Sequence, residues 1–319
     1  MKVLIFGDAN VDVTVKWADV EKNLHLLSAR NRKLVLFCRS KSQKGTSDLE
    51  YYLGRPDAEL SKFFNSLDPV VRPGGCGAIK AMSMARLGHK VIFYSWVGDD
   101  GNGIAVLDDL SDAGVDVSNV IVAGRTCETY NLSSGGQKRL AMSYWKPKIK
   151  FSGFLAKVKK ERPDAVFLTG AHRVKAPMGY AKLPGAFVFT GSFSEYSKAE
   201  IAKKYGGDFS NGILVANDAE IVQLSGARDA FLGMKKLANP LIVMHGRHLT
   251  AVKRGSRTII SRTLPLDRRR VTELTGIGDV WESTFIGSVG NLKKASEQEI
   301  RSAMLIASKA AIRRMTMGN

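Results

Sequence analysis

ELTGIGD, residues 273–279, places two glycines and a carboxylate where a helix should begin, because an apolar-periodic run follows from Val280. Unpaired backbone N–H groups at a helix start, with the positive end of the helix dipole, form an anion site, and glycine lets a phosphate approach the backbone. Asp279 would repel such an anion, so we expect it to take a proton from an alcohol that attacks the anion. The stretch therefore predicts phosphoryl transfer to a hydroxyl group. A glycine turn in which Asp279 only caps the helix dipole is the alternative.

A second glycine-rich stretch lies about 200 residues earlier in the chain. It runs VRPGGCGA (71–78), IKAMSMARLG (79–88) and HKVIFYSWVGDDGNG (89–103). This order of glycine turn, small-residue helix, glycine stop, strand and acidic glycine loop resembles the first signature of the ribokinase-like (PfkB) family of carbohydrate and nucleoside kinases. Residues 275–279 resemble that family's second signature, usually Asp-Thr-x-Gly-Ala-Gly-Asp. With segments 1–15 and 217–220, the resemblance covers nearly the whole chain.

Strands that alternate with helices predict an α/β fold with a mostly parallel sheet flanked by helices on both faces. We expect strands at 2–6, 11–15, 34–37, 165–168, 186–189, 212–215 and 241–244, a loop at 40–47, and helices at 103–113, from 151, at 194–204, 219–224 and 227–238. The resemblance implies a ribokinase-like sheet with a small β-sheet lid. We therefore expect a single domain, 1–319, with lid segments at about 11–50 and 119–145.

The second signature supplies the predicted catalytic groups. Asp279 is the expected general base, and the backbone amides of Gly276, Ile277 and Gly278 are expected to form an anion hole for the transferred phosphoryl group. Because those donors belong to the main chain, Ile277 in place of the family's alanine should be tolerated. Two further departures from the signature are Glu273 and Leu274. The resemblance places a monovalent cation near this segment, so these departures put a potassium requirement in doubt.

The resemblance also implies ATP as the phosphoryl donor and Mg²⁺ as its companion. Asn217 and Glu220 match the family's Asn-x-x-Glu, in which the carboxylate organises Mg²⁺ through water. The same two residues have the spacing of a capping box, with Asn217 as the N-cap. The other expected nucleotide contacts are Gly246, Thr275 and Ala307, although helical periodicity alone would place Ala307 in the core.

The phosphate acceptor is expected beside the first strand and the first glycine turn. Asn10 and Asp12 match the family's Asn-x-Asp, in which the carboxylate accepts hydrogen bonds from neighbouring sugar hydroxyls. An exposed polar strand face is the alternative for Asp12. Gly74 and Gly75 would let the backbone contact the acceptor.

One polar contact to the acceptor is missing from the sequence. The family often has Asn at the position of Ile79, and an apolar side chain cannot make that hydrogen bond. Either Lys80 substitutes for it, or the acceptor is a nucleoside or a less polar alcohol. A phosphosugar kinase is an alternative that would need cationic side chains near the acceptor, for which Arg125, Lys138 and Arg139 are candidates.

The formal charge of +18 raises the question of a polyanionic partner. A basic surface attracts polyanions in a salt-dependent manner. A catalytically weak homologue that binds ligands or nucleic acid is therefore an alternative of a different class, although we favour a solvated surface without a nucleic-acid partner. No apolar run approaches the roughly 20 residues that span a bilayer, and MKVLIF (1–6) is too short for a signal peptide. We expect a cytoplasmic protein without a membrane partner, with a homodimer through the lid left open.

Overall fold

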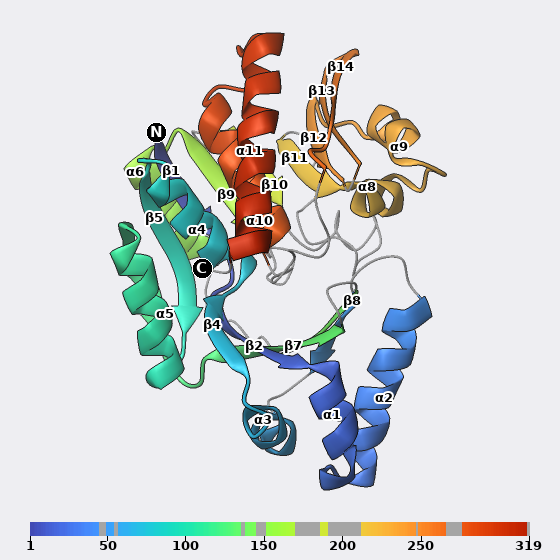
Figure 1. Cartoon of the computed structure of the whole chain (residues 1–319). Helices are drawn as coiled ribbons and strands as arrows, with labels where there is room; N and C mark the ends of the chain where they lie inside the picture. The colour runs from blue at the N-terminus through green and yellow to red at the C-terminus, as the bar shows by residue number, and fades with distance from the viewer. Residues whose placement is uncertain are drawn as a thin grey trace.

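A computed structural model of the chain describes residues 1–44, 49–53, 57–134, 138–144, 151–169, 186–190, 212–246, 248–265 and 276–317. The strands in these ranges form two sheets, a large one of nine strands and a small one of five (Figure 1). Across the same ranges, no helix combines the length and the apolar character that a bilayer-crossing segment requires.

The large sheet is parallel except at one edge. Its order is β14-β13-β12-β11-β10-β9-β1-β5-β6. All neighbours from β12 to β6 run parallel, and β13 and β14 add an antiparallel hairpin. The strands are β1 (Lys2–Phe6), β5 (Lys90–Val97), β6 (Val115–Val122), β9 (Ala165–Thr169), β10 (Ala186–Thr190), β11 (Ile213–Asn217), β12 (Leu241–His245), β13 (Leu249–Arg254) and β14 (Arg257–Arg262).

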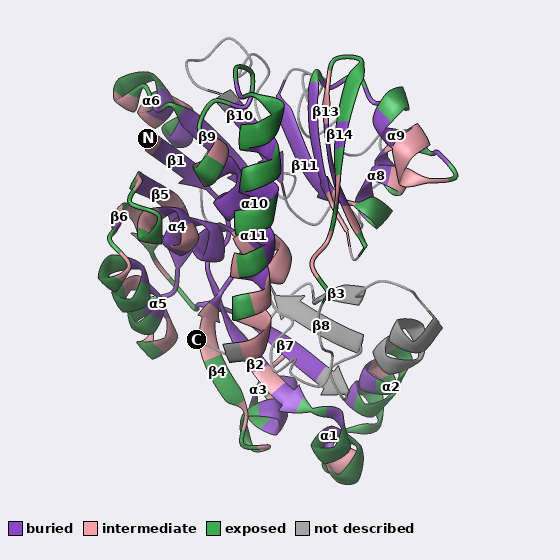
Figure 2. Ribbon diagram, turned by 45° about the horizontal axis from the view of Figure 1, so that its top comes forward, coloured by how far each residue is buried: buried purple, intermediate pink, exposed green. Residues whose placement is uncertain are grey.

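Helices cover both faces of this sheet. Successive strand side chains point to opposite faces, so Val3 and Ile5 of β1 enter one apolar core while Leu4 and Phe6 enter another. The first core includes side chains of α4 (Cys76–Arg86), α5 (Gly101–Asp112), α10 (Ile277–Val289) and α11 (Glu297–Met317). The second includes side chains of α6 (Phe151–Glu161), α8 (Asp218–Ser225) and α9 (Ala230–Lys236). The inner strands are accordingly buried (Figure 2), and the predicted α/β architecture, a mostly parallel sheet with helices on both faces, is confirmed.

The small sheet is connected to the carboxyl end of β1. Its order is β3-β8-β7-β2-β4, formed by β2 (Asn10–Lys16), β3 (Leu49–Leu53), β4 (Val70–Gly74), β7 (Cys127–Ser134) and β8 (Lys138–Tyr144). Three residues join β1 to β2, and β4 leads into α4. On the side away from the large sheet lie α1 (Trp17–Asn23), the 3-10 helix η1 (Leu24–Leu26), α2 (Ala29–Lys44) and α3 (Ala58–Asn65) (Figure 1). Phe64 of α3 stacks on Tyr130 of β7 with ring centroids 4.8 Å apart.

The structure corrects some local predictions. Residues 34–37 and 40–44 belong to α2 rather than to a strand and a loop, and only Val35 of the four apolar residues is fully buried. Residues 119–122, expected in the lid, lie in β6, which pairs with β5 in the large sheet. Residues 70–74, outside the predicted lid segments, form an edge strand of the small sheet. The helix expected at 194–204 lies outside the described residues.

Candidate active site

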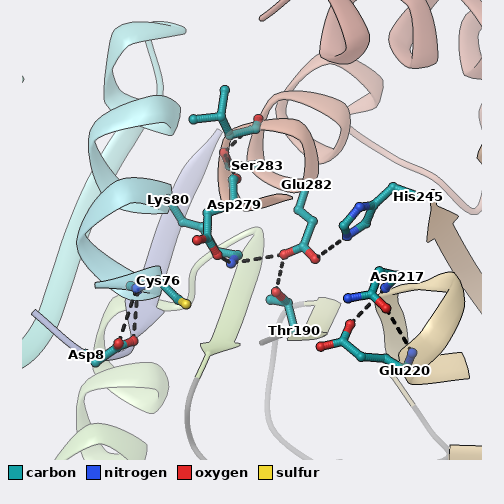
Figure 3. A network of polar contacts seen from close by, with 12 residues as sticks. Asp8, Cys76, Lys80, Thr190, Asn217, Glu220, His245, Asp279, Glu282 and Ser283 are labelled. Carbon is teal, nitrogen blue, oxygen red and sulfur yellow. Dashed lines mark hydrogen bonds and ion pairs between the residues drawn. The ribbon is translucent and has the colours of Figure 1, made fainter. Parts of the chain in front are cut away.

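Three helices begin where several strands of the large sheet end. Thr190, Asn217 and His245 close β10, β11 and β12, and α4, α8 and α10 start beside them (Figure 3). Ligands of open parallel sheets bind at the carboxyl ends of the strands. Both glycine-rich stretches and the 217–220 segment therefore meet at the edge where a ligand is expected.

The start of α10 depends on glycine. Gly276 has φ 72°, and a Cβ atom there would lie 2.5 Å from Cδ1 of Ile79, so both the backbone conformation and the close packing exclude a side chain. A Cβ atom on Gly278 would lie 3.1 Å from Cε1 of His245. Val280 N–H closes the first turn by donating to the Gly276 carbonyl at 2.9 Å. Among the described residues no side chain caps α10, so its first amides remain available to an anion.

Asp279 belongs to a buried network of charged side chains (Figure 3). The ammonium group of Lys80 donates to Asp279 Oδ1 and forms an ion pair with Glu282 Oε2 at 3.0 Å. Glu282 also accepts a hydrogen bond from the Thr190 hydroxyl, and its Oε1 lies 2.8 Å from His245 Nε2. The side chains of Lys80 and Glu282 are 0% and 6% exposed, while that of Asp279 is 13% exposed. Asp279 is thus the more exposed of the two carboxylates.

Burial and neighbouring charges act differently on the two carboxylates. Burial raises the pKa of Asp279, and the charge of Glu282 adds to that rise, which together outweigh the opposing effect of Lys80. Burial alone would also raise the pKa of Glu282, but Lys80 and His245 lower it to about 2. Although burial alone would lower the pKa of Lys80, both carboxylates raise it above its ordinary value. The network therefore keeps Lys80 and Glu282 charged and makes Asp279 the more basic carboxylate.

The start of α4 is arranged differently, because an internal carboxylate occupies it. Asp8 accepts hydrogen bonds from Cys76 N–H at 3.2 Å and from Gly77 N–H at 3.1 Å, and its carbonyl accepts from Ala78 N–H at 3.0 Å. Gly75 turns the chain into this helix with φ 94°, and a Cβ atom there would lie 2.7 Å from the Asp8 carbonyl oxygen. The first glycine-rich stretch therefore packs its helix start against the end of β1.

Asn10 and Asp12 lie together on β2, opposite the glycine turn. Asn10 Nδ2 donates to Thr129 Oγ1 at 2.6 Å and to Asp12 Oδ1 at 3.3 Å. The Oδ1 atom of Asn10 is buried without a hydrogen-bond partner, and a Cβ atom on Gly75 would lie 2.6 Å from it. A Cβ atom on Gly74 would lie 2.3 Å from Asp12 Oδ2. The predicted acceptor residues are thus brought together, with one buried oxygen left to accept a hydrogen bond.

The capping box predicted as one role for Asn217 and Glu220 is formed. Asn217 Oδ1 accepts from Glu220 N–H at 2.9 Å, and Glu220 Oε2 accepts from Asn217 N–H at 2.8 Å. Gly246 follows β12, and a Cβ atom there would lie 3.2 Å from Asp218 Oδ2, which shows the close approach of its backbone to α8. Ala307 of α11 is fully buried in the first apolar core. The nucleotide roles of these residues stay predictions.

Arg125, a candidate for binding a phosphosugar, is occupied by an internal carboxylate. Its Nη2 donates to Glu128 at 3.1 Å and to the Ser61 hydroxyl at 2.9 Å, and Tyr130 donates to the same carboxylate. This cluster joins α3 to β7, so it stabilises the small sheet. The side chains of Thr275, Glu273, Leu274, Lys138 and Arg139 lie outside what the structure describes.

The sequence analysis missed three residues of the polar network around Asp279, namely Glu282, Thr190 and His245. Glu282 carried a usable signal, because residues three apart in a helix share a face and Glu282 stands one turn after Asp279. Thr190 and His245 carried none, since their contacts with Glu282 span 92 and 37 residues of chain. Lys80, expected to contact the acceptor, is instead fully buried against the two carboxylates of α10.

Part of the chain matches a known protein family. A family model described as pfkB family carbohydrate kinase matches residues 65–162, which contain the first glycine-rich stretch. The predicted resemblance to the ribokinase-like (PfkB) family is confirmed. No curated protein matches the chain significantly.

Solved structures of kinases share the fold at low sequence identity. Adenosine kinase from Sinorhizobium meliloti is 16% identical with a TM-score of 0.69, and the match covers 97% of this chain and 92% of that one. Adenosine kinase from Anopheles gambiae, in complex with P1,P4-di(adenosine-5) tetraphosphate, is 13% identical with a TM-score of 0.73 over 99% and 96% of the two chains. Aminoimidazole riboside kinase from Salmonella enterica, complexed with aminoimidazole riboside and an ATP analogue, is 14% identical with a TM-score of 0.67 over 99% and 94%.

Proposed function

We propose that the protein is an ATP-dependent kinase that transfers the γ-phosphoryl group to a hydroxyl of a sugar or nucleoside. The observation that carries this proposal is the position of Asp279. Its carboxylate is partly exposed, has a raised pKa, and lies in the first turn of a helix that no described side chain caps. The confirmed family resemblance and the kinase folds of the structural neighbours support the same reaction class.

In the proposed reaction, Asp279 accepts the proton of the acceptor hydroxyl as that oxygen attacks the γ-phosphorus, and the bond from this phosphorus to the β,γ-bridging oxygen breaks to release ADP. A raised pKa favours this step, because a general base acts best when its pKa approaches the working pH. The backbone amides of Gly276, Ile277 and Gly278 would stabilise the charge that develops on the transferred phosphoryl group. Phosphoryl transfer depends mainly on such positioning and charge stabilisation.

The residues at the start of α8 fit Mg²⁺ bound through water. Mg²⁺ keeps several waters and uses few protein carboxylates, and the described residues contain no cluster of three or more acidic, His or Cys side chains that could hold a metal. Glu220 is buried and fixed by Asn217, so it would present a rigid carboxylate to those waters. When bound, Mg²⁺ would neutralise charge on the ATP phosphates. Gly246 and Ala307, with Thr275, would border the nucleotide.

Asn10, Asp12, Gly74 and Gly75 would hold the acceptor. The unpartnered Oδ1 of Asn10 and the carboxylate of Asp12 are hydrogen-bond acceptors, so they suit the hydroxyl groups of a substrate, which donate. Ile79 packs its side chain against Gly276, so this wall is apolar. That combination of hydrogen-bond acceptors and an apolar wall suits a nucleoside, in which the ribose carries a nucleobase, as well as a simple sugar. The small sheet would act as the lid over this acceptor.

The test is ADP release with adenosine, inosine, D-ribose and D-fructose as acceptors and Mg·ATP as donor. We expect at least one acceptor to be turned over, and Asp279→Asn to lower kcat by about 10²–10⁴-fold, because the amide cannot take the proton. Asp279→Asn should retain ATP binding in calorimetry. Turnover unchanged by Asp279→Asn would exclude this residue as the base, and the absence of turnover with salt-sensitive retention on nucleic acid would favour a binding protein.

A further inference from the structure

We propose that Lys80 and Glu282 act as a pair of positioning residues for Asp279, with Glu282 holding the lysine and the lysine holding the base. The inference rests on the proposed function, because it assigns a purpose to the groups around the general base. It gives Lys80 a role different from direct contact with the acceptor.

The direction from which Lys80 approaches Asp279 supports this role. Its side chain is 0% exposed, whereas that of Asp279 is 13% exposed, so the ammonium group reaches the carboxylate from the interior. The hydrogen bond joins Lys80 to Oδ1. Within the described ranges no hydrogen bond is found for Oδ2, so this oxygen is left for the proton of an acceptor. Lys80 therefore fixes the carboxylate without covering it (Figure 3).

Glu282 is itself tied to the large sheet. His245 at the end of β12 contacts Oε1, and Thr190 at the end of β10 donates to Oε2. His245 stacks on Trp281 with ring centroids 5.4 Å apart, and Trp281 Nε1 donates to Ser308 of α11 at 3.2 Å. The chain of contacts thus runs from two strands through Glu282 and Lys80 to Asp279, so the sheet determines where the base lies.

The charge balance explains why two carboxylates share one lysine. A buried ammonium without a counterion is strongly unfavourable, because the interior cannot replace the water that would stabilise its charge. If Asp279 were the sole counterion of Lys80, the lysine would hold it fully ionised and weaken it as a base. Glu282 supplies the second charge, so Lys80 stays paired when Asp279 accepts a proton. Three charged groups act on Asp279: the carboxylates of Asp8 and Glu282 and the ammonium group of Lys80. Cys76 also faces Lys80, and Glu220 also faces His245.

The experiment measures kcat/KM against pH with the best acceptor among adenosine, inosine, D-ribose and D-fructose. The acid limb of this profile reports the pKa of the base in the free enzyme. In Glu282→Gln a negative neighbour is lost, so the limb should move to lower pH by about one unit, while kcat falls and the KM for ATP is unchanged. In Lys80→Gln the positive neighbour is lost, so the limb should move to higher pH. The double variant Lys80→Gln/Glu282→Gln should give a limb between those of the single variants.

Ser283→Ala is the matched control, because the Ser283 hydroxyl bonds the carbonyl of Asp279 at 2.6 Å on the same buried helix face but carries no charge. It should leave the acid limb in place.

Limbs that move in opposite directions in the two single variants support the proposal, since a general loss of stability would not produce opposite shifts. Unmoved limbs, or shifts in the same direction, overturn it while leaving the kinase assignment intact. If Lys80→Gln does not fold, Glu282→Gln and the double variant carry the test. A wild type inactive on every acceptor overturns the proposed function and this inference with it. Turnover unaffected by Asp279→Asn excludes Asp279 as the base and overturns this inference alone.

Discussion

The two glycine-rich stretches both build a helix start, but within the part of the chain that the structure describes only one leaves its amides available. At α4, Asp8 fills the start with its own carboxylate and carbonyl. At α10, no described side chain caps the first turn, and the nearby carboxylate of Asp279 is turned toward Lys80. The difference shows that a glycine turn before a helix does not by itself define an anion site. What decides is whether a carboxylate from another part of the chain already occupies the amides.

The largest expected effect comes from disturbing the start of α10. In Gly276→Ala the new side chain would sit on a backbone with positive φ and would clash with Ile79. We therefore expect the free energy of unfolding to fall by about 2–4 kcal/mol, together with a large loss of turnover. Gly88→Ala is the matched control, because Gly88 has φ 83° with nothing within 4 Å of the added Cβ atom. That variant should lose only about 1 kcal/mol. Urea unfolding measures both, and equal losses would show that Ile79 yields to the added methyl group.

A smaller effect is expected at the filled helix start. Asp8→Ala leaves the N–H groups of Cys76 and Gly77 without their partner, which should lower the free energy of unfolding by about 1–3 kcal/mol. The vacated amides should then bind an anion, so inorganic phosphate should raise the Tm of Asp8→Ala more than that of Asp8→Asn, which keeps a side-chain acceptor. Thermal unfolding with and without phosphate checks this. Identical phosphate effects in the two variants would mean that Asp8 does not keep anions from α4.

α8 offers a third helix start, capped by its own Asn217. Asn217→Ala should cost about 1 kcal/mol through the lost cap. Asp229→Ala removes the equivalent cap of α9, where Asp229 accepts from Leu232 N–H at 2.9 Å, and should cost about the same. Only the α8 variant should also weaken Mg·ATP binding in calorimetry. Equal ATP affinities in both variants would restrict Asn217 and Glu220 to capping.

The smallest effect concerns pH. Burial alone would lower the pKa of His245, but its hydrogen bond to Glu282 and the charges of Glu282 and Glu220 raise it on balance above the ordinary 6.5. A group whose pKa is raised in the folded state stabilises the fold at low pH and loses that contribution as the pH rises through its folded value. The free energy of unfolding should therefore fall as the pH rises above 6.5, and His245→Gln should flatten this slope. A slope that is the same in the variant would assign the dependence to other groups.

The buried strands were predictable because their signal is local. The runs at 3–6, 165–168 and 241–244 are continuously apolar, which suits strands covered on both faces. Leu34–Phe37 gave the same signal in a basic helix, because four residues are too few to separate the two periods. At the site, the glycine context of Asp279 predicted it as the base, and that role stays a prediction. Its bond to Lys80 spans 199 residues, so no local pattern could reveal that a buried ion pair holds this carboxylate.

Single-turnover transfer from γ-labelled ATP, in wild type and Asp279→Asn side by side, tests the central claim most directly. With ATP affinity matched by calorimetry, the account predicts label on the acceptor within one turnover in wild type and a rate at least about 10²-fold lower in the variant. Equal rates of label transfer in the two proteins would contradict the claim that the carboxylate at the start of α10 takes the proton.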